Sequence, residues 1–457
     1  MSLRPSLASF HRGSFTHEIT AARNDLNREP SHEDSPALPA STVPSLSPVG
    51  ASSPELEPDS GAETPTTPGS DEEVEQVVAD SFAFAFDIDG VLVRGGRPIP
   101  EAIEAMKVLN GENKYGIIIP YIFLTNGGGK SEKERCRDLS KQLEIDISPA
   151  QFICGHTPMS EMADKYKTVL VVGGEGEKCR DVARTYGFKD VITPGDIIKT
   201  DSTTTPFRKL TDEEHKNSIK RNFNDVVIEA IFVFADSRDW AGDLQIIIDL
   251  AMSKGGRIGT LSETFDEGPP IYFSHNDVVW SAAHDNVRLG MGALRGIVEY
   301  TFKEVTKGKT IETHAFGKPQ IGTFEFAMRL LKRWRKNKHK LNAPPNTVYF
   351  VGDTPESDIR GTNQYNESAP NDWYSILVKT GVYQDGTGPA YKPRVTVDTV
   401  LDAVNHGIER EMAGLRKAKA SKNLAMPDMP KLSLENAKNV SVVSPAEERA
   451  LELIVDS

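Results

Sequence analysis

Strand-sized apolar runs alternate with helical stretches between residues 81 and 415, and this alternation constrains the fold more than any other feature of the chain. Apolar runs predict strands at 82–86, 121–124, 168–172, 226–235, 347–351 and 375–379. Helical apolar spacing predicts helices at 100–109, 131–143, 179–186, 243–252, 291–302, 320–335 and 399–413. Because parallel strands need long crossovers, usually helices, the pattern predicts an α/β fold with a doubly wound, mostly parallel, Rossmann-like sheet.

The first 79 residues have a different composition from the rest of the chain. They contain 13 acidic residues, 4 arginines and no lysine, and 17 of the 40 residues at 31–70 are Ser or Pro. Such a segment buries too little apolar area to offset its chain entropy, so we expect an acidic, disordered tail. Residues 1–17 hold Arg4 and Arg12 and no acid. This start is compatible with a mitochondrial transit peptide or with an ordinary disordered terminus, so a mitochondrial and a cytoplasmic location both stay open.

Charge and cysteine content exclude several classes of protein. The net charge of −13 argues against a nucleic-acid partner, which would need a basic surface. Three cysteines in 457 residues exclude a disulfide scaffold. No apolar run reaches the roughly 18 residues that a transmembrane segment needs. Oligomeric state is left open by the sequence.

Polar residues follow the predicted strands at the points where a doubly wound sheet binds its ligands. Asp87 and Asp89 follow the first strand, and Thr125, Asn126 and Gly127 follow the second. Lys318 precedes a predicted helix. Asp353 follows the run at 347–351, and Asp358 lies five residues further on.

This set of residues suits phosphoryl chemistry. Asp87, Asp89, Asp353 and Asp358 are candidate ligands of Mg²⁺, a hard cation that prefers carboxylate oxygens and keeps positions for water and phosphate. Asp87 is the candidate nucleophile and would form an aspartyl-phosphate, while Asp89 would serve as the general acid and base.

Further residues are expected to bind the phosphate group of the substrate. The Thr125 hydroxyl and the backbone beside Asn126 and Gly127 would bind the phosphoryl oxygens, and Lys318 would neutralise their charge.

These motifs resemble the four motifs of the haloacid dehalogenase-like (HAD) hydrolases. Residues 87–92 (DIDGVL), 124–127 (LTNG), Lys318, and Gly352-Asp353 with Asp358 carry the resemblance, which covers about 81–415. It implies the roles given above for Asp87, Asp89, Thr125, Lys318 and Asp353. Dehalogenases in the superfamily lack the second aspartate, so Asp89 favours phosphoryl transfer.

The long insertion between Thr125 and Lys318 resembles the C2-type α/β cap of subfamily IIA. Residues 274–300 are most similar to the cat-eye-syndrome-critical-region-type hydrolases, which include fungal mitochondrial members. The resemblance implies that Asn276 and Asp277 bind substrate from the cap, and it implies a link to glycerophospholipid metabolism. We expect core segments at 81–165 and 300–415, a cap at 166–299 and an extension at 416–457.

The expected function is Mg²⁺-dependent hydrolysis of a small organic phosphomonoester. A phosphotransferase that uses the same intermediate, and a non-catalytic metabolite-binding or scaffold protein of the same fold, remain alternatives. The basic segment 329–340 has two interpretations, a packed helix with a basic end and a peripheral membrane contact, and the packed helix is favoured. His275 and His284 are interpreted as ordinary polar or packing residues, and Trp280 as a core residue.

Overall fold

The computed structural model describes residues 77–384, 386 and 388–424. The predictions for the acidic tail, for a transit peptide and for residues 425–457 lie outside the described residues. The folded part begins earlier than the expected position near Ser81, because Val78 already pairs with Ile118 and Ala79 is buried. None of the helices in the described ranges is both long and apolar enough to cross a membrane.

The core sheet has six strands in the order β15-β14-β13-β1-β4-β5, and all of its pairings are parallel. The strands are β1 (Phe82–Phe86), β4 (Tyr121–Leu124), β5 (Phe152–Ile153), β13 (Thr347–Gly352), β14 (Asp372–Val378) and β15 (Val395–Val397). The helices around this sheet are α2 (Pro100–Leu109), α3 (Glu132–Leu143), α9 (Ile321–His339), α10 (Arg360–Asn366) and α11 (Val400–Leu424). A short ribbon of β2 (Val93–Arg94) and β3 (Arg97–Pro98) follows β1.

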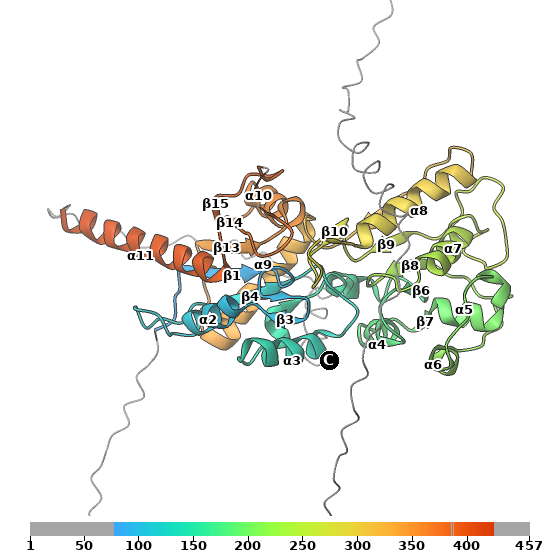
Figure 1. Cartoon of the computed structure of the whole chain (residues 1–457), viewed down its shortest axis with the longest axis horizontal. Coiled ribbons are helices and arrows are strands. Elements are labelled where there is room, and N and C mark those ends of the chain that lie inside the picture. Colours follow the sequence, from blue (N-terminus) through green and yellow to red (C-terminus); the bar gives the residue numbers. More distant parts are fainter. Residues whose placement is uncertain (1–76, 385, 387, 425–457) are drawn as a thin grey trace, which may run out of the picture. The chain divides into compact units, whose positions relative to one another are not determined.

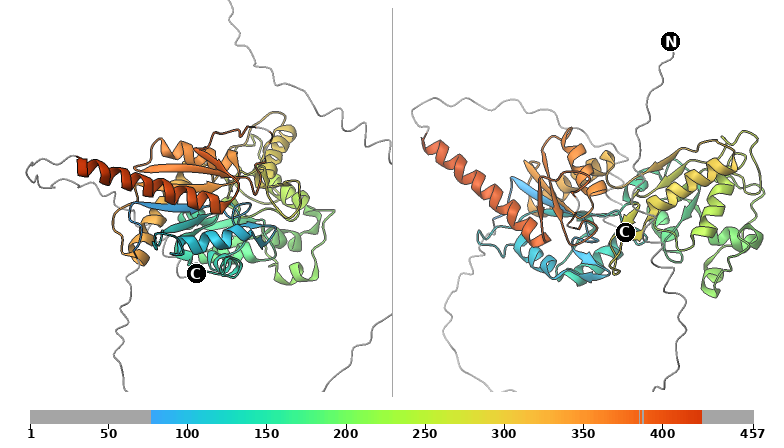
Figure 2. Two further views of the ribbon diagram at one scale, coloured as in Figure 1. Left: turned by 60° about the vertical axis from the view of Figure 1, so that its left-hand side comes forward. Right: turned by 45° about the horizontal axis from the view of Figure 1, so that its top comes forward.

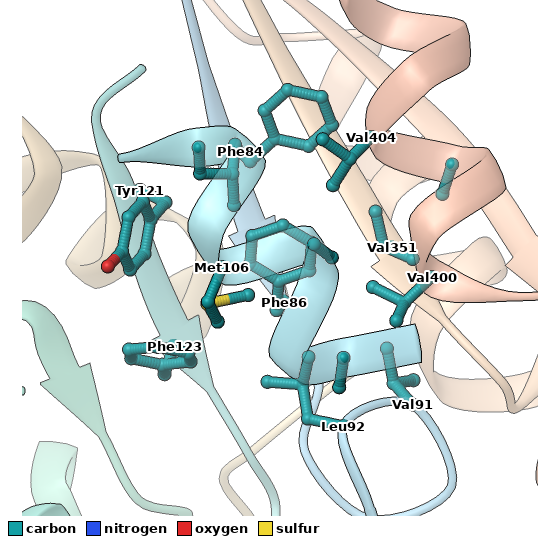
Figure 3. Packing of buried hydrophobic residues seen from close by; sticks show 14 of the residues in the cluster. Phe84, Phe86, Val91, Leu92, Met106, Tyr121, Phe123, Val351, Val400 and Val404 are labelled. Carbon is teal, nitrogen blue, oxygen red and sulfur yellow. The ribbon is translucent and has the colours of Figure 1, made fainter. Parts of the chain in front are cut away.

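Because Phe and Ala alternate along β1, the Phe side chains lie on one face of the core sheet and the Ala side chains on the other. Phe82, Phe84 and Phe86 point into one apolar cluster, where residues of α2, α3 and α11 cover them (Figure 3). Ala83 and Ala85 face a second cluster, to which α9 and α10 contribute. Successive side chains of a strand point to opposite faces, so this five-residue sequence requires helices on both sides, as the doubly wound prediction stated. The predicted fold class is confirmed.

The cap sheet has five parallel strands in the order β12-β9-β8-β6-β7. Its strands are β6 (Thr168–Val172), β7 (Asp190–Ile192), β8 (Ala230–Val233), β9 (Ile271–Phe273) and β12 (Thr313–Ala315). Its helices are α4 (Lys178–Thr185), α5 (Pro194–Thr200), α6 (Asp212–Asn217), α7 (Trp240–Ala251) and α8 (Met291–Val305) (Figure 1). Residues of α5, α7 and α8 pack on one face of this sheet and residues of α4 on the other. An antiparallel ribbon of β10 (Val279–Trp280) and β11 (Arg288–Leu289) precedes α8.

Two expected boundaries are wrong. Residues 300–315 do not belong to the core, because β12 pairs with β9 and Phe302 of α8 packs in the cap. The boundary at 415 falls inside α11, which continues to Leu424 (Figure 2). The strand expected at 226–235 is shorter in the structure, where only β8 (Ala230–Val233) forms. The sequence did not predict β5, β7, β9 and β12, because two or three residues are too few to show a period.

The basic helix is a packed helix, as favoured. Phe324, Phe326, Leu330 and Leu331 of α9 are buried, and the basic residues lie toward its C-terminal end. Arg335 is fully buried, and its guanidinium donates to the carbonyls of Asp80, Phe82 and Ala343. Membrane contact by this helix stays a prediction.

A matched pair of glycines in α11 tests the packing of this helix on the core sheet. A Cβ on Gly407 would lie 2.6 Å from Phe84 Cζ, whereas one on Gly414 would meet nothing within 4 Å. We expect Gly407→Ala to lower the free energy of unfolding by about 1–3 kcal/mol through overpacking. Gly414→Ala should raise it by up to about 1 kcal/mol, because alanine is the better helix former. Urea unfolding of both variants measures the difference, and equal effects would contradict the packing.

Candidate active site

Three strand ends bring the predicted aspartates together. Strand β1 lies between β4 and β13 in parallel register, so Asp87, Thr125 and Asp353 emerge at the same edge of the core sheet. Asp358 lies in the short helical segment η4 (Pro355–Ile359) that follows β13. Its Oδ2 accepts hydrogen bonds from the backbone N–H groups of Asp353 and Thr354, which fixes the carboxylate under the sheet edge.

Lys318 reaches this cluster from the chain that leaves the cap sheet after β12. Its Nζ lies 2.7 Å from Asp87 Oδ1 and 2.8 Å from Asp358 Oδ1, and the side chain is 1% exposed. Burial alone would lower the pKa of this amine, but the carboxylates of Asp358 and Asp87 outweigh burial and raise the pKa. Lys318 is therefore charged at neutral pH.

The cluster holds more negative than positive groups. One oxygen of each of Asp87, Asp353 and Asp358 lies within 4.8 Å of the others. Burial, with repulsion from Asp358 and Asp353, raises the pKa of Asp87 well above its usual value although Lys318 opposes the shift. Burial and Asp358 raise the pKa of Asp353 to about 7. Three hard oxygen ligands this close together fit a divalent cation such as Mg²⁺.

Two glycines allow the backbone to close around Asp353. Gly90 has φ +91°, and a Cβ on either Gly90 or Gly381 would overlap the Asp353 carboxylate. Asp353 Oδ2 instead accepts a hydrogen bond of 2.7 Å from the backbone N–H of Val382. The carboxylate is thus oriented by main chain on one side.

Asp89 does not join the carboxylate cluster. Its Oδ2 lies 3.9 Å from Arg135 Nη2, and its side chain is 32% exposed in the same cavity as Asp87. Asp89 is not among the three aspartates whose oxygens lie within 4.8 Å of one another, so metal binding by its carboxylate stays a prediction. Burial raises the pKa of Asp89, although Arg135 opposes the shift. A raised pKa suits a group that donates a proton.

In the loop after β4, the side chains of Thr125 and Asn126 make different kinds of contact. Thr125 Oγ1 accepts a hydrogen bond of 2.9 Å from Gly127 N–H, which leaves the hydroxyl hydrogen for a ligand in the cavity. Asn126 Nδ2 donates to Asp277 Oδ2 and to the carbonyl of Lys318, and Asn126 Oδ1 accepts from Lys318 N–H at 2.7 Å. The side-chain polar atoms of Asn126 thus position Lys318 and Asp277, and the expected phosphate contact by the backbone of this loop stays a prediction.

Asn276 and Asp277, the two cap residues predicted to bind substrate, lie in different surroundings. Asp277 lines the cavity, whereas Asn276 is exposed outside it and accepts a hydrogen bond from Arg295 Nη1 at 3.1 Å. Asn276 is therefore not among the residues that line this cavity, and its expected contact with substrate stays a prediction.

The cavity above the aspartates has a volume of about 420 Å³ and is lined by both the core and the cap. Most of its lining residues were not predicted as site residues, among them Arg135, Asp236, Arg238, His275 and Trp280. Trp280 is 37% exposed, so its expected place in the core is wrong. His275 is buried and lies 3.7 Å from Asp277 Oδ2 through Nδ1. Only the resemblance of residues 274–300 to a cap segment indicated part of this region.

Comparison with known proteins agrees with this geometry. Residues 84–189 match the model of the haloacid dehalogenase-like hydrolases, and residues 315–403 match a HAD-hydrolase-like model. A mitochondrial hydrolase of Saccharomyces cerevisiae is 39% identical over 358 residues, which cover 73% of this chain and 97% of that protein. A cardiolipin synthase (CMP-forming) / mitochondrial hydrolase fusion protein of Schizosaccharomyces pombe is 40% identical over 350 residues. The match covers 75% of this chain but spans only 56% of the fusion protein.

Among solved structures, p-nitrophenyl phosphatase from Archaeoglobus fulgidus aligns with 72% of this chain and 100% of its own, at 16% identity and a TM-score of 0.46. The extent of the match to the yeast hydrolase, with the two family models that match 84–189 and 315–403, establishes the family. The chain belongs to the haloacid dehalogenase-like hydrolases.

Proposed function

We propose that the chain is a Mg²⁺-dependent phosphohydrolase that cleaves small organic phosphomonoesters through an aspartyl-phosphate on Asp87. The observation that carries this proposal is the buried contact of Lys318 with Asp87 and Asp358 beside the third carboxylate of Asp353. A dense cluster of acids with one lysine at the base of a cavity is poorly explained as packing, since buried charges that are incompletely paired destabilise a fold.

Asp87, Asp353 and Asp358 would hold the cation, which would neutralise phosphate oxygens and let an anionic nucleophile approach phosphorus. Asp87 would attack phosphorus, forming one P–O bond as the bond to the leaving alcohol breaks. Asp89 would donate its proton to the leaving oxygen and then take a proton from the water that hydrolyses the aspartyl-phosphate. The Thr125 hydroxyl would donate to a phosphoryl oxygen, and Lys318 would balance charge through both steps.

The relatives support a location and a metabolic context for this activity. Both curated relatives are named as mitochondrial hydrolases, and one is fused to a cardiolipin synthase. On this basis we assign the chain to mitochondria and link its substrate to glycerophospholipid metabolism.

Replacing the nucleophile tests the proposal directly. We expect Asp87→Asn to reduce phosphate release from a panel of phosphomonoesters by about 10³-fold or more, with the fold retained. The matched control is Asp398→Asn, because Asp398 follows β15 of the same sheet but its side chain is 78% exposed. Turnover by Asp87→Asn at the rate of the control would remove Asp87 from this role.

The second aspartate has a separate kinetic signature. With p-nitrophenyl phosphate, whose leaving group needs little protonation, we expect Asp89→Asn to form the aspartyl-phosphate but to hydrolyse it about 10²–10⁴-fold more slowly. Intact-protein mass spectrometry after rapid acid quenching should then detect one added phosphoryl group per chain. If the quenched variant carries no phosphoryl group while wild type does, Asp89 is needed to form the aspartyl-phosphate rather than to hydrolyse it.

Metal binding should depend on pH with a defined sign. Because the pKa of Asp353 is raised to about 7, protons compete with the cation at acid pH and leave the site at alkaline pH. Mg²⁺ at 100 times the Kd that it has at pH 8 should add about 2.7 kcal/mol to the free energy of unfolding near pH 8. The same Mg²⁺ concentration should add markedly less near pH 5.5. Thermal unfolding with and without Mg²⁺ measures this, and Asp353→Asn should abolish the gain while Asp398→Asn keeps it.

A further inference from the structure

A fully buried carboxyl group that the proposed mechanism does not use lies at the start of α3. It belongs to Glu132, which is 0% exposed, and its Oε2 has no hydrogen-bond partner among the described residues. A buried polar group destabilises a fold unless it is hydrogen-bonded. The contacts of the other carboxyl oxygen are therefore the ones that keep this residue in place.

That oxygen, Glu132 Oε1, joins the core to two other segments. It accepts a hydrogen bond of 2.6 Å from Thr157 Oγ1, in the crossing segment (residues 154–167) that connects β5 with β6. It also accepts a hydrogen bond from the hydroxyl of Tyr186, which ends α4 in the cap. Both donor residues are buried. One carboxyl oxygen therefore links the core, the crossing segment and the cap.

The Tyr186 hydroxyl extends this contact to a histidine of the crossing segment. Its oxygen lies 2.7 Å from Nδ1 of His156, which is 0% exposed. The single hydroxyl hydrogen is donated to Glu132, so neutral His156 carries its proton on Nδ1 and donates it to the tyrosine oxygen. Glu132, Tyr186 and His156 thus form a buried Glu–Tyr–His network.

The imidazole ring of His156 packs against the loop after β4. A Cβ on Gly128 would lie 2.8 Å from His156 Cδ2 and 2.6 Å from the carbonyl oxygen of Phe234. The Phe234 ring stacks on the imidazole, with ring centroids 5.5 Å apart and ring planes at 14°. Beside the histidine, the backbone N–H of Gly155 donates to the carbonyl of Gly127. The crossing segment and the cap therefore form the surface on which this loop lies.

We propose that the Glu–Tyr–His network positions the loop after β4 for phosphate binding. It holds the loop in the conformation in which Thr125 and the backbone beside Gly127 meet a phosphoryl group. The inference rests on the proposed function. None of the three network residues lines the cavity above the aspartates, so they act through the loop rather than on the substrate.

Removing the tyrosine hydroxyl breaks the network but keeps the aromatic ring. We expect Tyr186→Phe to raise the KM for p-nitrophenyl phosphate and the inhibition constant of inorganic phosphate about tenfold each, with kcat changed less. Both constants rise together because the loop contacts phosphoryl oxygens in the bound ester and in the bound product alike.

Tyr349→Phe is the matched control. Tyr349 of β13 is also fully buried, and its hydroxyl donates to a glutamate, Glu411 of α11, but it does not line the cavity. This variant should lower the melting temperature, as Tyr186→Phe does, yet leave both constants within about twofold of wild type. Equal rises of the two constants in both variants, or no rise in either, overturn the proposal.

Glu132 tests the network from its other end, and it keeps the proposal testable if Tyr186→Phe does not fold. Glu132→Gln retains an oxygen that accepts hydrogen bonds, so it should raise the inhibition constant of phosphate less than Glu132→Ala. Combining Glu132→Ala with Tyr186→Phe should raise it no further than the larger single effect, because both changes remove the same contact. Additive effects would contradict a shared network.

Phosphate binding provides a readout that does not need turnover. Calorimetric titration with inorganic phosphate in the presence of Mg²⁺ should show about tenfold weaker binding by Tyr186→Phe than by wild type or Tyr349→Phe. If wild type hydrolyses no phosphomonoester but this difference persists, the proposed function fails while the positioning role is upheld. If turnover is observed and the difference is absent, the positioning role fails alone.

Discussion

The buried ion pairs of Lys318 with Asp87 and Asp358 are the interaction on which the site depends. The lysine follows β12 of the cap sheet, whereas its partners follow β1 and β13 of the core sheet, so the contacts of 2.7 and 2.8 Å hold the two sheets' connecting segments together. One cation does not neutralise three buried carboxylates. Burial, together with the remaining negative charge, raises the pKa of Asp87 and of Asp353. The excess negative charge makes the cluster receptive to a divalent cation.

Polar contacts between core and cap continue away from the lysine. Asn126 bonds both to the Lys318 backbone and to Asp277 of the cap, and Glu132 of α3 accepts hydrogen bonds from Thr157 and from Tyr186 at the end of α4. Buried hydrogen bonds of this kind specify geometry because each unpaired partner would lose its solvation without compensation.

Much of the fold could be predicted because the long elements repeat their pattern several times. The alternation of Phe and Ala in β1 and the apolar spacing of α9 each indicate which side chains of that element are buried. The short strands β9 and β12 gave no such signal, so residues 300–315 were assigned to the wrong sheet. At the site, Asp87, Lys318, Asp353 and Asp358 converge as expected, whereas Asp89 lines the same cavity without joining this cluster, and Asn276 is not among the lining residues. These positions depend on contacts between segments far apart in the chain, which local sequence does not determine.

The amino-acid sequence by itself determined the strand and helix order, the residues at the strand ends and therefore the type of chemistry. These follow from local periodicity and from the rule that parallel strands present their carboxyl ends at one edge. Tertiary structure alone decided which carboxylates lie close enough together to hold a cation, that Asn126 positions its neighbours, and that Trp280 lines a cavity instead of a core. Each of these outcomes is set by distances between residues far apart in the chain, and such distances exist only once both sheets have packed.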